Sequence, residues 1–386
     1  MSDEDERRET RETVLTVRGL SVAFGFDKNG KPRDGVEPLQ VTDRVSFDIH
    51  EGEFFALVGE SGCGKSVTAM SILRLLPWPS AKIVGGAVLY RAGGESEPVD
   101  LSKLPLADLQ KVRGSEIACI FQEPMQALNP VVTIRKQLLE VFKFSSPSPS
   151  TQSPCGGQGD NRKLLSFWRP KADRISAEQK SPDDPLAEIR EMLLQAGFKD
   201  IDRVLDSYPH ELSGGMLQRV CIVMALLSKP KLIIADEPTT ALDVTVQAQV
   251  LAVLQDMANR TGTAVLLITH NMGIVSQYAD RVAVMYAGRV VETGPVRDVI
   301  ENPLHPYTQG LLAAIPENHS DMRTMKSIPG SVPHPKDFVQ GCRFADRCEK
   351  CKNAPEELRA KCLSAQLPPR QEAPGSASHE ANCFCL

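Results

Sequence analysis

The chain has 386 residues, of which 41% are hydrophobic and 24% are charged, and its formal net charge is −5. This length allows two or three domains or one large domain with appendages, and the composition is that of a globular protein with a substantial core. The mildly acidic balance argues against a general nucleic-acid-binding protein, which is usually basic. No stretch is apolar for the ~18 residues that a membrane-spanning helix needs, so we expect any membrane role to depend on a partner.

The N-terminal segment is strongly charged and has no apolar core of the kind that a signal peptide contains. We predict a disordered tail over residues 1–13. Apolar residues then form three candidate strands, separated by a polar, turn-rich connection at 27–38 and followed by a candidate helix that Pro77 and Pro79 end. The predicted strands cover 14–22, 44–49 and 54–58, and the predicted helix covers 65–76.

Residues 145–185 are rich in Ser, Pro and Gly in their first part, which predicts a flexible insertion. Beyond it, strand and helix patterns alternate to about residue 300, as in a largely parallel α/β sheet. Pro and Cys become frequent after residue 315, so we predict a separate small module over 316–386. Six of the ten cysteines lie in the last 45 residues.

Residues 59–66 read GESGCGKS and fit the phosphate-binding pattern G-x-x-x-x-G-K-[ST]. Glycines let several backbone N–H groups face one anion, and the helix that begins there adds its dipole. A Gly-rich turn with no ligand is the alternative, but the apolar strand before the loop and the helix after it favour a nucleotide site. We therefore assign nucleotide contacts to Gly59, Glu60, Ser61, Gly62, Cys63, Gly64, Lys65, Ser66 and Val67.

Residues 232–238 read LIIADEP, a buried strand that ends in two carboxylates. Ligands of open α/β sheets bind at that end of the strands. We predict that Asp236 holds Mg²⁺ together with Ser66, and that Glu237 is the general base that activates water. The alternative is a strand end with two solvated acids.

Residues 212–219 read LSGGMLQR and precede a candidate helix over 216–227. Ser213 has the side chain of an N-cap, and Gly214 and Gly215 leave their N–H groups unobstructed. This is a second candidate anion site, although an ordinary capped helix would look the same. Two phosphate-binding helix ends in one chain suggest a sandwich, in which the second end serves a nucleotide held by another subunit.

In this order and spacing, the three motifs resemble the ATP-binding family of ABC transporters over residues 14–315, interrupted by 145–185. The resemblance implies an α/β P-loop NTPase fold with a RecA-like core and a helical subdomain at about 123–230. It also implies roles for residues that match family motifs. These are Gln122 in IFQEP for Mg²⁺ and coupling, Gln218 in the signature, Asp243 in TTALD, His270 in LLITHN as the γ-phosphate switch, and Phe24 for adenine stacking, with Phe26 as a substitute.

Residues 301–316 (ENPLHPYTQGLLAAIP), 328–330 (IPG) and 341–348 (GCRFADRC) resemble the segment that follows the ATPase domain in dipeptide, oligopeptide and nickel importers. Some members of that branch hold a [4Fe–4S] cluster there. The resemblance implies ligands at Cys342, Cys348, Cys362 and Cys383. Extra residues after Cys348 leave Cys351 as a substitute for Cys362, and Cys385 is a lesser alternative to Cys383. Four thiolates also suit zinc, and cysteines that bind no metal are the third alternative.

The resemblance implies an ATP- and Mg²⁺-dependent energy-coupling subunit of an importer for dipeptides or oligopeptides, at the cytoplasmic face of the membrane. Its expected partners are a second ATPase subunit, identical or related, in a head-to-tail dimer, two permease subunits and, indirectly, an extracytoplasmic solute-binding protein. The alternatives are nickel or another small solute as cargo, an exporter, a non-catalytic protein, and a soluble ABC ATPase of translation or DNA repair. The last is disfavoured because the chain has one ATPase domain and no heptads. No nucleic acid is expected as a partner.

Overall fold

The computed structural model describes residues 11–35, 37–93, 97–145, 184–240, 242–314, 328–374 and 376–386. Residues 1–10 of the predicted tail and 146–183 of the predicted insertion lie outside the described residues. The first strand begins at Thr13, which pairs with His50, so the chain is already ordered within the segment predicted as a tail.

The larger of two sheets has eight strands in the order β11-β12-β10-β9-β3-β8-β7-β6. Strands β6, β7, β8, β3 and β9 run parallel, so their carboxyl ends meet at one edge. Strands β3, β7 and β8 are buried along their whole length, which explains why their sequences are continuous apolar runs. The bounds are Phe54–Val58 (β3), Ile117–Ile120 (β6), Leu232–Asp236 (β7), Ala264–Thr269 (β8), Arg281–Tyr286 (β9), Arg289–Pro295 (β10), Arg370–Ala373 (β11) and Ser376–Asn382 (β12).

The second sheet is antiparallel, with four strands in the order β2-β1-β4-β5. Helix α2 (Lys65–Ile72) contacts both sheets, and the apolar cluster around it includes residues from the two. The helix ends earlier than predicted, because Arg74 adopts a left-handed backbone conformation. The strand bounds are Thr13–Phe24 (β1), Leu39–His50 (β2), Ala81–Tyr90 (β4) and Val99–Asp100 (β5).

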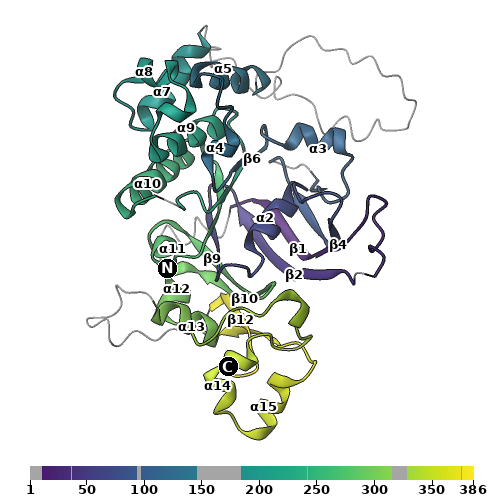
Figure 1. Ribbon diagram of the computed structural model, residues 1–386. Coiled ribbons are helices and arrows are strands. Elements are labelled where there is room, and N and C mark those ends of the chain that lie inside the picture. The colour runs from purple at the N-terminus through teal and green to yellow at the C-terminus, as the bar shows by residue number, and fades with distance from the viewer. Residues whose placement is uncertain are drawn as a thin grey trace.

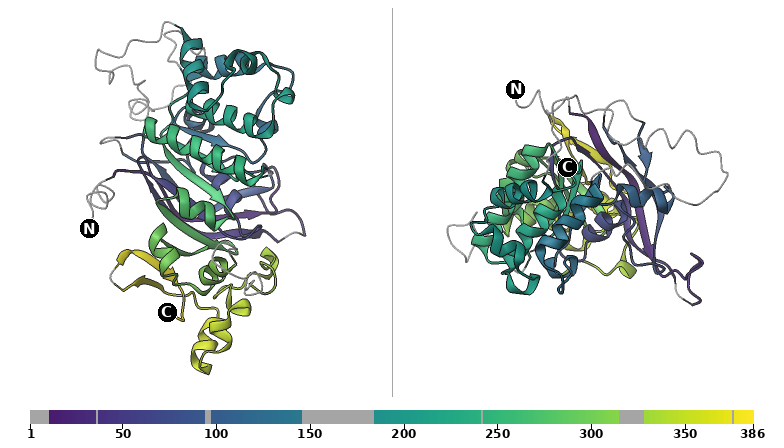
Figure 2. Two further views of the ribbon diagram at one scale, coloured as in Figure 1. Left: turned by 90° about the vertical axis from the view of Figure 1, so that its left-hand side faces the viewer. Right: turned by 90° about the horizontal axis from the view of Figure 1, so that it is seen from above.

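A lobe of helices lies at one end of the molecule, and the last residues of the chain lie at the other (Figure 1). Views at right angles show the same order of lobe, sheets and C-terminal residues (Figure 2). The lobe contains α4 (Pro124–Ala127), α5 (Ile134–Ser145), α7 (Pro185–Gln195), α8 (Ile201–Asp206), η2 (Pro209–Glu211) and α9 (Gly214–Leu226). The described residues also form α3 (Leu106–Val112), α10 (Val244–Thr261) and α11 (Met272–Tyr278).

We call residues 328–386 the C-terminal region. It continues the main sheet, because β12 pairs with β10 and β11 pairs with β12. Its short helices share an apolar cluster with β9 and with the two helices that precede it. The helix bounds are Val296–Glu301 (α12), Pro306–Ala313 (α13), Pro335–Asp337 (η5), Ala345–Arg347 (η6), Glu349–Lys352 (α14) and Glu356–Leu363 (α15).

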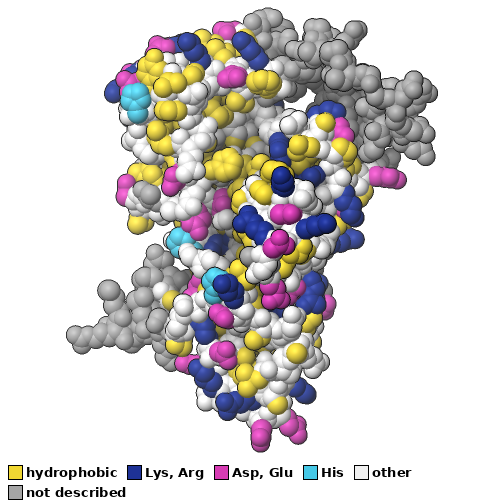
Figure 3. All heavy atoms as spheres, turned by 45° about the vertical axis from the view of Figure 1, so that its right-hand side comes forward, with side chains coloured by type: hydrophobic (Ala, Val, Ile, Leu, Met, Phe, Trp, Pro, Cys, Tyr) yellow, Lys and Arg dark blue, Asp and Glu magenta, His cyan; other side chains and the backbone are white. Residues whose placement is uncertain are grey.

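Among the described residues, no helix is both long enough and apolar enough to cross a bilayer. On the face drawn in Figure 3, Lys and Arg side chains alternate with Asp and Glu side chains, and hydrophobic side chains lie between them. This mixture agrees with the small net charge of the sequence.

A candidate nucleotide-binding site

The loop at 59–64 joins the buried strand β3 to helix α2. Gly59 packs so closely that an added Cβ would lie 2.1 Å from the carbonyl oxygen of Met285. Gly64 is the N-cap of α2 with φ 105°, a conformation that glycine adopts without a steric cost. The glycines of GESGCGKS are therefore required by the fold of the loop as well as by any phosphate that it holds.

Lys65 is 4% exposed, and its Nζ donates hydrogen bonds to the carbonyl oxygens of Gly59 (2.8 Å) and Glu60 (3.1 Å). These bonds keep a buried ammonium group satisfied inside the loop. Cys63 is fully buried, and this burial raises the pKa of its thiol. The predicted contact at Cys63 can therefore involve its backbone but not a free side chain.

Ser66 and Asp236 meet at the carboxyl end of β7, where the Ser66 hydroxyl donates a hydrogen bond of 3.0 Å to the Asp236 carboxylate. Burial raises the pKa of Asp236, and the charge of Glu237 acts in the same direction, against the Ser66 hydrogen bond and the Lys65 charge. A hydroxyl and a carboxylate are oxygen ligands of the kind that Mg²⁺ takes beside phosphates. Two of the three side chains predicted to hold the metal, Ser66 and Asp236, thus lie together.

Glu237 and His270 follow neighbouring parallel strands, β7 and β8. The Glu237 N–H donates to the carbonyl oxygen of Ile268 (3.0 Å), and Glu237 has φ 45°. Its carboxylate accepts a hydrogen bond from the Thr240 hydroxyl (2.9 Å) and lies 3.3 Å from Nδ1 of His270. The structure therefore brings the predicted base and the predicted switch histidine together. Sequence reasoning missed Thr240, although it lies only three residues after Glu237.

Two further predicted residues lie near strand ends. Gln122 follows β6, the neighbour of β7, and is exposed. Phe24 ends β1 and is partly buried, whereas Phe26 is only 6% exposed, with the Lys82 ammonium over its ring. Of the two aromatic candidates for adenine stacking, Phe24 therefore keeps more of its ring accessible.

Helix α9 begins at the signature motif, and Ser213 caps it by accepting a hydrogen bond from the Met216 N–H (3.4 Å). The glycines that follow pack against the start of α10, because an added Cβ would lie 3.2 Å from Leu242 at Gly214 and 2.4 Å from Val246 at Gly215. Helix α9 lies in the helical lobe, away from α2 (Figure 1).

Asp243 and Gln218, which were also predicted to take part in the site, differ in exposure. Asp243 is the exposed N-cap of α10 and accepts a hydrogen bond from the Val246 N–H (3.0 Å). Gln218 is 1% exposed, so a contact between its side chain and a nucleotide stays a prediction.

The predicted metal site of the C-terminal region is not supported. Among the described residues, no group of three or more His, Cys, Asp or Glu side chains is arranged to hold a metal ion. The Sγ atoms of Cys362 and Cys385 lie 3.6 Å apart. Neither the iron–sulfur nor the zinc prediction is supported, for the ligands Cys342, Cys348, Cys362 and Cys383 or for the substitutes Cys351 and Cys385.

Packing explains this outcome. Cys348, Cys351 and Cys362 belong to the apolar cluster that joins the C-terminal region to the main sheet. Burial raises the pKa of the Cys342 thiol to about 11 and that of Cys383 to about 12. These side chains thus pack in the core of the C-terminal region.

Fold and site together define a P-loop ATPase cassette, and comparison with known proteins identifies its family. Residues 42–240 match the family model described as ABC transporter, and residues 291–354 match the one described as the C-terminal region of oligopeptide/dipeptide transporters. The chain belongs to the ABC transporter family, and the match at its C-terminal end falls on the oligopeptide/dipeptide branch. Both resemblances expected from the sequence motifs are confirmed.

Similar proteins support this assignment. The oligopeptide transport ATP-binding protein AppD of Bacillus subtilis (strain 168) is 43% identical over 88% of this chain and 89% of its own. A protein of Sinorhizobium fredii, named as a probable peptide ABC transporter ATP-binding protein, is 42% identical over 79% of this chain and 80% of its own.

Solved structures agree on the fold. A nucleotide-free ATP-binding cassette from an ABC transporter has a TM-score of 0.53 at 22% identity and covers 78% of this chain and 98% of its own. The dimeric cassette MJ0796, in a post-hydrolysis state with ADP and Pi, has a TM-score of 0.52 at 24% identity, with 73% and 99% covered. The predicted fold class, a P-loop NTPase domain of ABC type, is confirmed.

Proposed function

We propose that this chain is the ATP-hydrolysing subunit of a membrane importer for dipeptides or oligopeptides. The observation that carries the proposal is the convergence of Lys65, Ser66, Asp236, Glu237 and His270 at the ends of three neighbouring parallel strands, in the order β3-β8-β7. The C-terminal match and the names of both relatives favour peptides over nickel chelates as the cargo.

In this proposal, the amides of the loop and the Lys65 ammonium bind the β- and γ-phosphates of ATP, and Phe24 stacks on adenine. Ser66, Asp236 and Gln122 would hold Mg²⁺, which neutralises charge on the phosphates. Glu237, oriented by Thr240, takes a proton from the attacking water. His270 donates to the γ-phosphate from its position beside Glu237.

The proposal also includes the assembly. Two cassettes pair head to tail, so that Ser213, Gly214, Gly215 and Asp243 of one subunit meet the nucleotide of the other. Gln122 couples the site to two permease subunits at the cytoplasmic face of the membrane, and a solute-binding protein delivers cargo from outside. The division into an ATPase domain (14–315) and a C-terminal module (316–386) remains a prediction of this proposal.

The first test measures phosphate release from Mg–ATP by the full chain and by Glu237→Gln. Removal of a positioned general base should lower kcat by about 100- to 1,000-fold, while ATP still binds. Glu301→Gln is a matched control, because Glu301 lies on the surface and pairs with Arg297. A full rate in Glu237→Gln would exclude Glu237 as the base.

The second test concerns the cargo. Vesicles that contain the permease subunits and this chain should accumulate labelled dipeptide or oligopeptide when ATP is supplied on the side of the ATPase. Accumulation of nickel chelate without peptide would favour the alternative cargo.

A further inference from the structure

Glu60, the second residue of the phosphate-binding loop, is held at three points. Its carboxylate accepts two hydrogen bonds from Arg347, with Nη1 2.8 Å from Oε2 and Nη2 3.1 Å from Oε1. Its N–H donates to the Tyr307 hydroxyl (2.9 Å), and its carbonyl oxygen accepts from Lys65 Nζ (3.1 Å). Two of these three partners lie outside the ATPase motifs, near the end of the chain.

Arg347 is a buried residue with several hydrogen-bond partners. It is 8% exposed, and its guanidinium also donates to the carbonyl oxygens of Pro329 (Nε, 2.8 Å) and Gly330 (Nη2, 3.2 Å). The ring of Tyr286 lies 5.7 Å from the guanidinium carbon, and its hydroxyl is 3.4 Å from Nη1. A buried, two-pronged arginine–carboxylate pair of this kind fixes geometry as well as charge.

Three aromatic rings pack against one another next to Arg347. The centroids of Tyr286 and Tyr307 are 4.6 Å apart, and Phe344 lies 5.1 Å from Tyr286 and 5.4 Å from Tyr307. All three side chains are buried. They join β9, α13 and the C-terminal region, so the two groups that hold Glu60 share one support.

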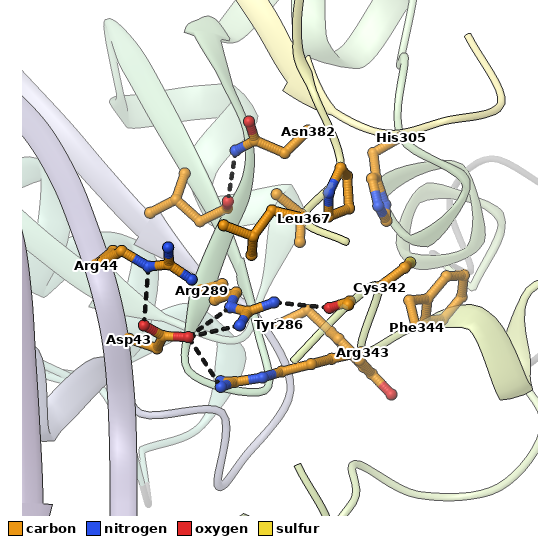
Figure 4. Close-up of a pocket in the computed structure, with 14 residues that line it drawn as sticks. Asp43, Arg44, Tyr286, Arg289, His305, Cys342, Arg343, Phe344, Leu367 and Asn382 are labelled. Atoms are coloured by element: carbon orange, nitrogen blue, oxygen red, sulfur yellow. Dashed lines mark hydrogen bonds and ion pairs between the residues drawn. The ribbon is translucent and has the colours of Figure 1, made fainter. Parts of the chain in front are cut away.

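Arg343, four residues before Arg347, anchors the same segment a second time. It donates to the Asp43 carboxylate (3.0 Å) and to the carbonyl oxygen of Ala287 (2.6 Å), and Arg289 also binds Asp43 (Figure 4). Gly288, which follows Ala287 in the chain, donates its N–H to the carbonyl oxygen of Cys63 in the loop (2.8 Å). The segment at 341–348 is therefore connected to the loop in two ways. One is the Arg347–Glu60 pair, and the other runs from Arg343 through Ala287 to the hydrogen bond between Gly288 and Cys63.

We propose that the C-terminal region braces the phosphate-binding loop, with Arg347 as a positioning residue that acts through Glu60. The inference rests on the proposed ATPase function. The position of Glu60 sets one of the two carbonyls that hold the Lys65 ammonium, and hence where the ammonium and the loop amides meet a phosphate. Without Arg347, the loop samples more conformations, and ATP binding must supply the order that the brace now supplies.

The test measures the Kd for ATP and the kcat of the full chain and of five variants. Arg347→Ala should weaken ATP binding by about tenfold, the size expected for a charged hydrogen-bonded pair, and should change kcat less than Kd. Arg347→Lys keeps the charge but loses the pair of parallel hydrogen bonds to the Glu60 carboxylate, so its Kd should lie between those of wild type and Arg347→Ala. Glu60→Ala combined with Arg347→Ala should be no worse than Glu60→Ala alone, because both remove one interaction. Arg370→Ala, which loses only a surface pair with Glu380, is the control.

Each outcome decides one question. Wild-type protein that binds no ATP overturns the proposed function, whereas active wild type with an unchanged Kd in Arg347→Ala overturns the brace alone. Additive effects of Glu60→Ala and Arg347→Ala overturn the route through Glu60. If thermal unfolding shows that Arg347→Ala does not fold, the Kd of Arg347→Lys decides, and a wild-type value overturns the brace.

Discussion

Helices α2 and α9 both begin at a glycine-rich turn, yet their surroundings differ. At α2, the loop meets a lysine, a serine and two carboxylates of the same chain, and Arg347 holds it from the C-terminal region. At α9, Ser213 caps its own helix, Gly214 packs against Leu242, and Gly215 packs against Val246 of α10. The same local motif is thus a nearly complete site in one place and, in our proposal, half a site in the other, where the nucleotide of a partner subunit completes it.

The largest expected effect tests this difference directly. Lys65→Ala should lower ATP hydrolysis by about 100-fold or more, because it removes the charge that faces the phosphates. Ser213→Ala should leave the ATP affinity of the single subunit unchanged but reduce hydrolysis. In a mixed pair of the two variants, one composite site contains both defects and the other contains neither, so mixing should restore activity measured as phosphate release.

Each variant assayed alone, at the same total protein concentration, is the control for that experiment. If mixed samples stay inactive while wild-type protein alone is active, the signature does not serve a partner's nucleotide.

The second prediction compares glycines at the two helix ends. An added Cβ at Gly59 would meet a backbone carbonyl, which cannot move, so Gly59→Ala should cost about 3 kcal/mol of unfolding free energy. At Gly215 the obstacle is the side chain of Val246, and the cost should be about 1 kcal/mol. Val246→Ala should rescue the second variant but not the first in chemical denaturation. Equal rescue of both would contradict the assigned contacts.

The third prediction concerns the cost of keeping a carboxylate at the α2 site. Because burial raises the pKa of Asp236 above 3.8, its charged form opposes folding at neutral pH, and this cost disappears once the group is protonated. Asp236→Asn should raise the unfolding free energy without nucleotide by about 1 kcal/mol and should abolish hydrolysis. The gain should shrink as the pH falls toward the raised pKa. A variant less stable than wild type at neutral pH would contradict this reading.

The smallest effect is expected at the cap of α9. The Ser213 hydrogen bond is long at 3.4 Å, so Ser213→Ala should cost only about 0.5 kcal/mol of unfolding free energy. Asp243→Ala, which removes a 3.0 Å cap from α10, should cost more, at about 1 kcal/mol. Thermal unfolding of both variants measures the order. A larger loss at Ser213 would mean that its main role is structural rather than in the paired site.

Much of the ATPase part could be predicted from the sequence because its signals are local. Residues 59–66, 212–219 and 232–238 each place glycines, a hydroxyl or carboxylates at a strand or helix end, and adjacent parallel strands bring such ends to one edge. The helix at α2 was predicted too long, because its apolar pattern continues past Ile72 although the backbone turns at Arg74. The cysteine spacing suggested a ligand set, but spacing along the chain does not determine where thiols pack.

The sequence by itself therefore determined the class of protein, the order of its motifs and the residues at the phosphate-binding loop, since these depend on short runs of adjacent residues. Only the tertiary structure showed that Arg347 holds Glu60, a contact between residues 287 positions apart. It also showed that the cysteines fill a core and that β12 extends the ATPase sheet. Such features depend on which distant surfaces meet when the chain folds, and no local pattern of residue types records that choice.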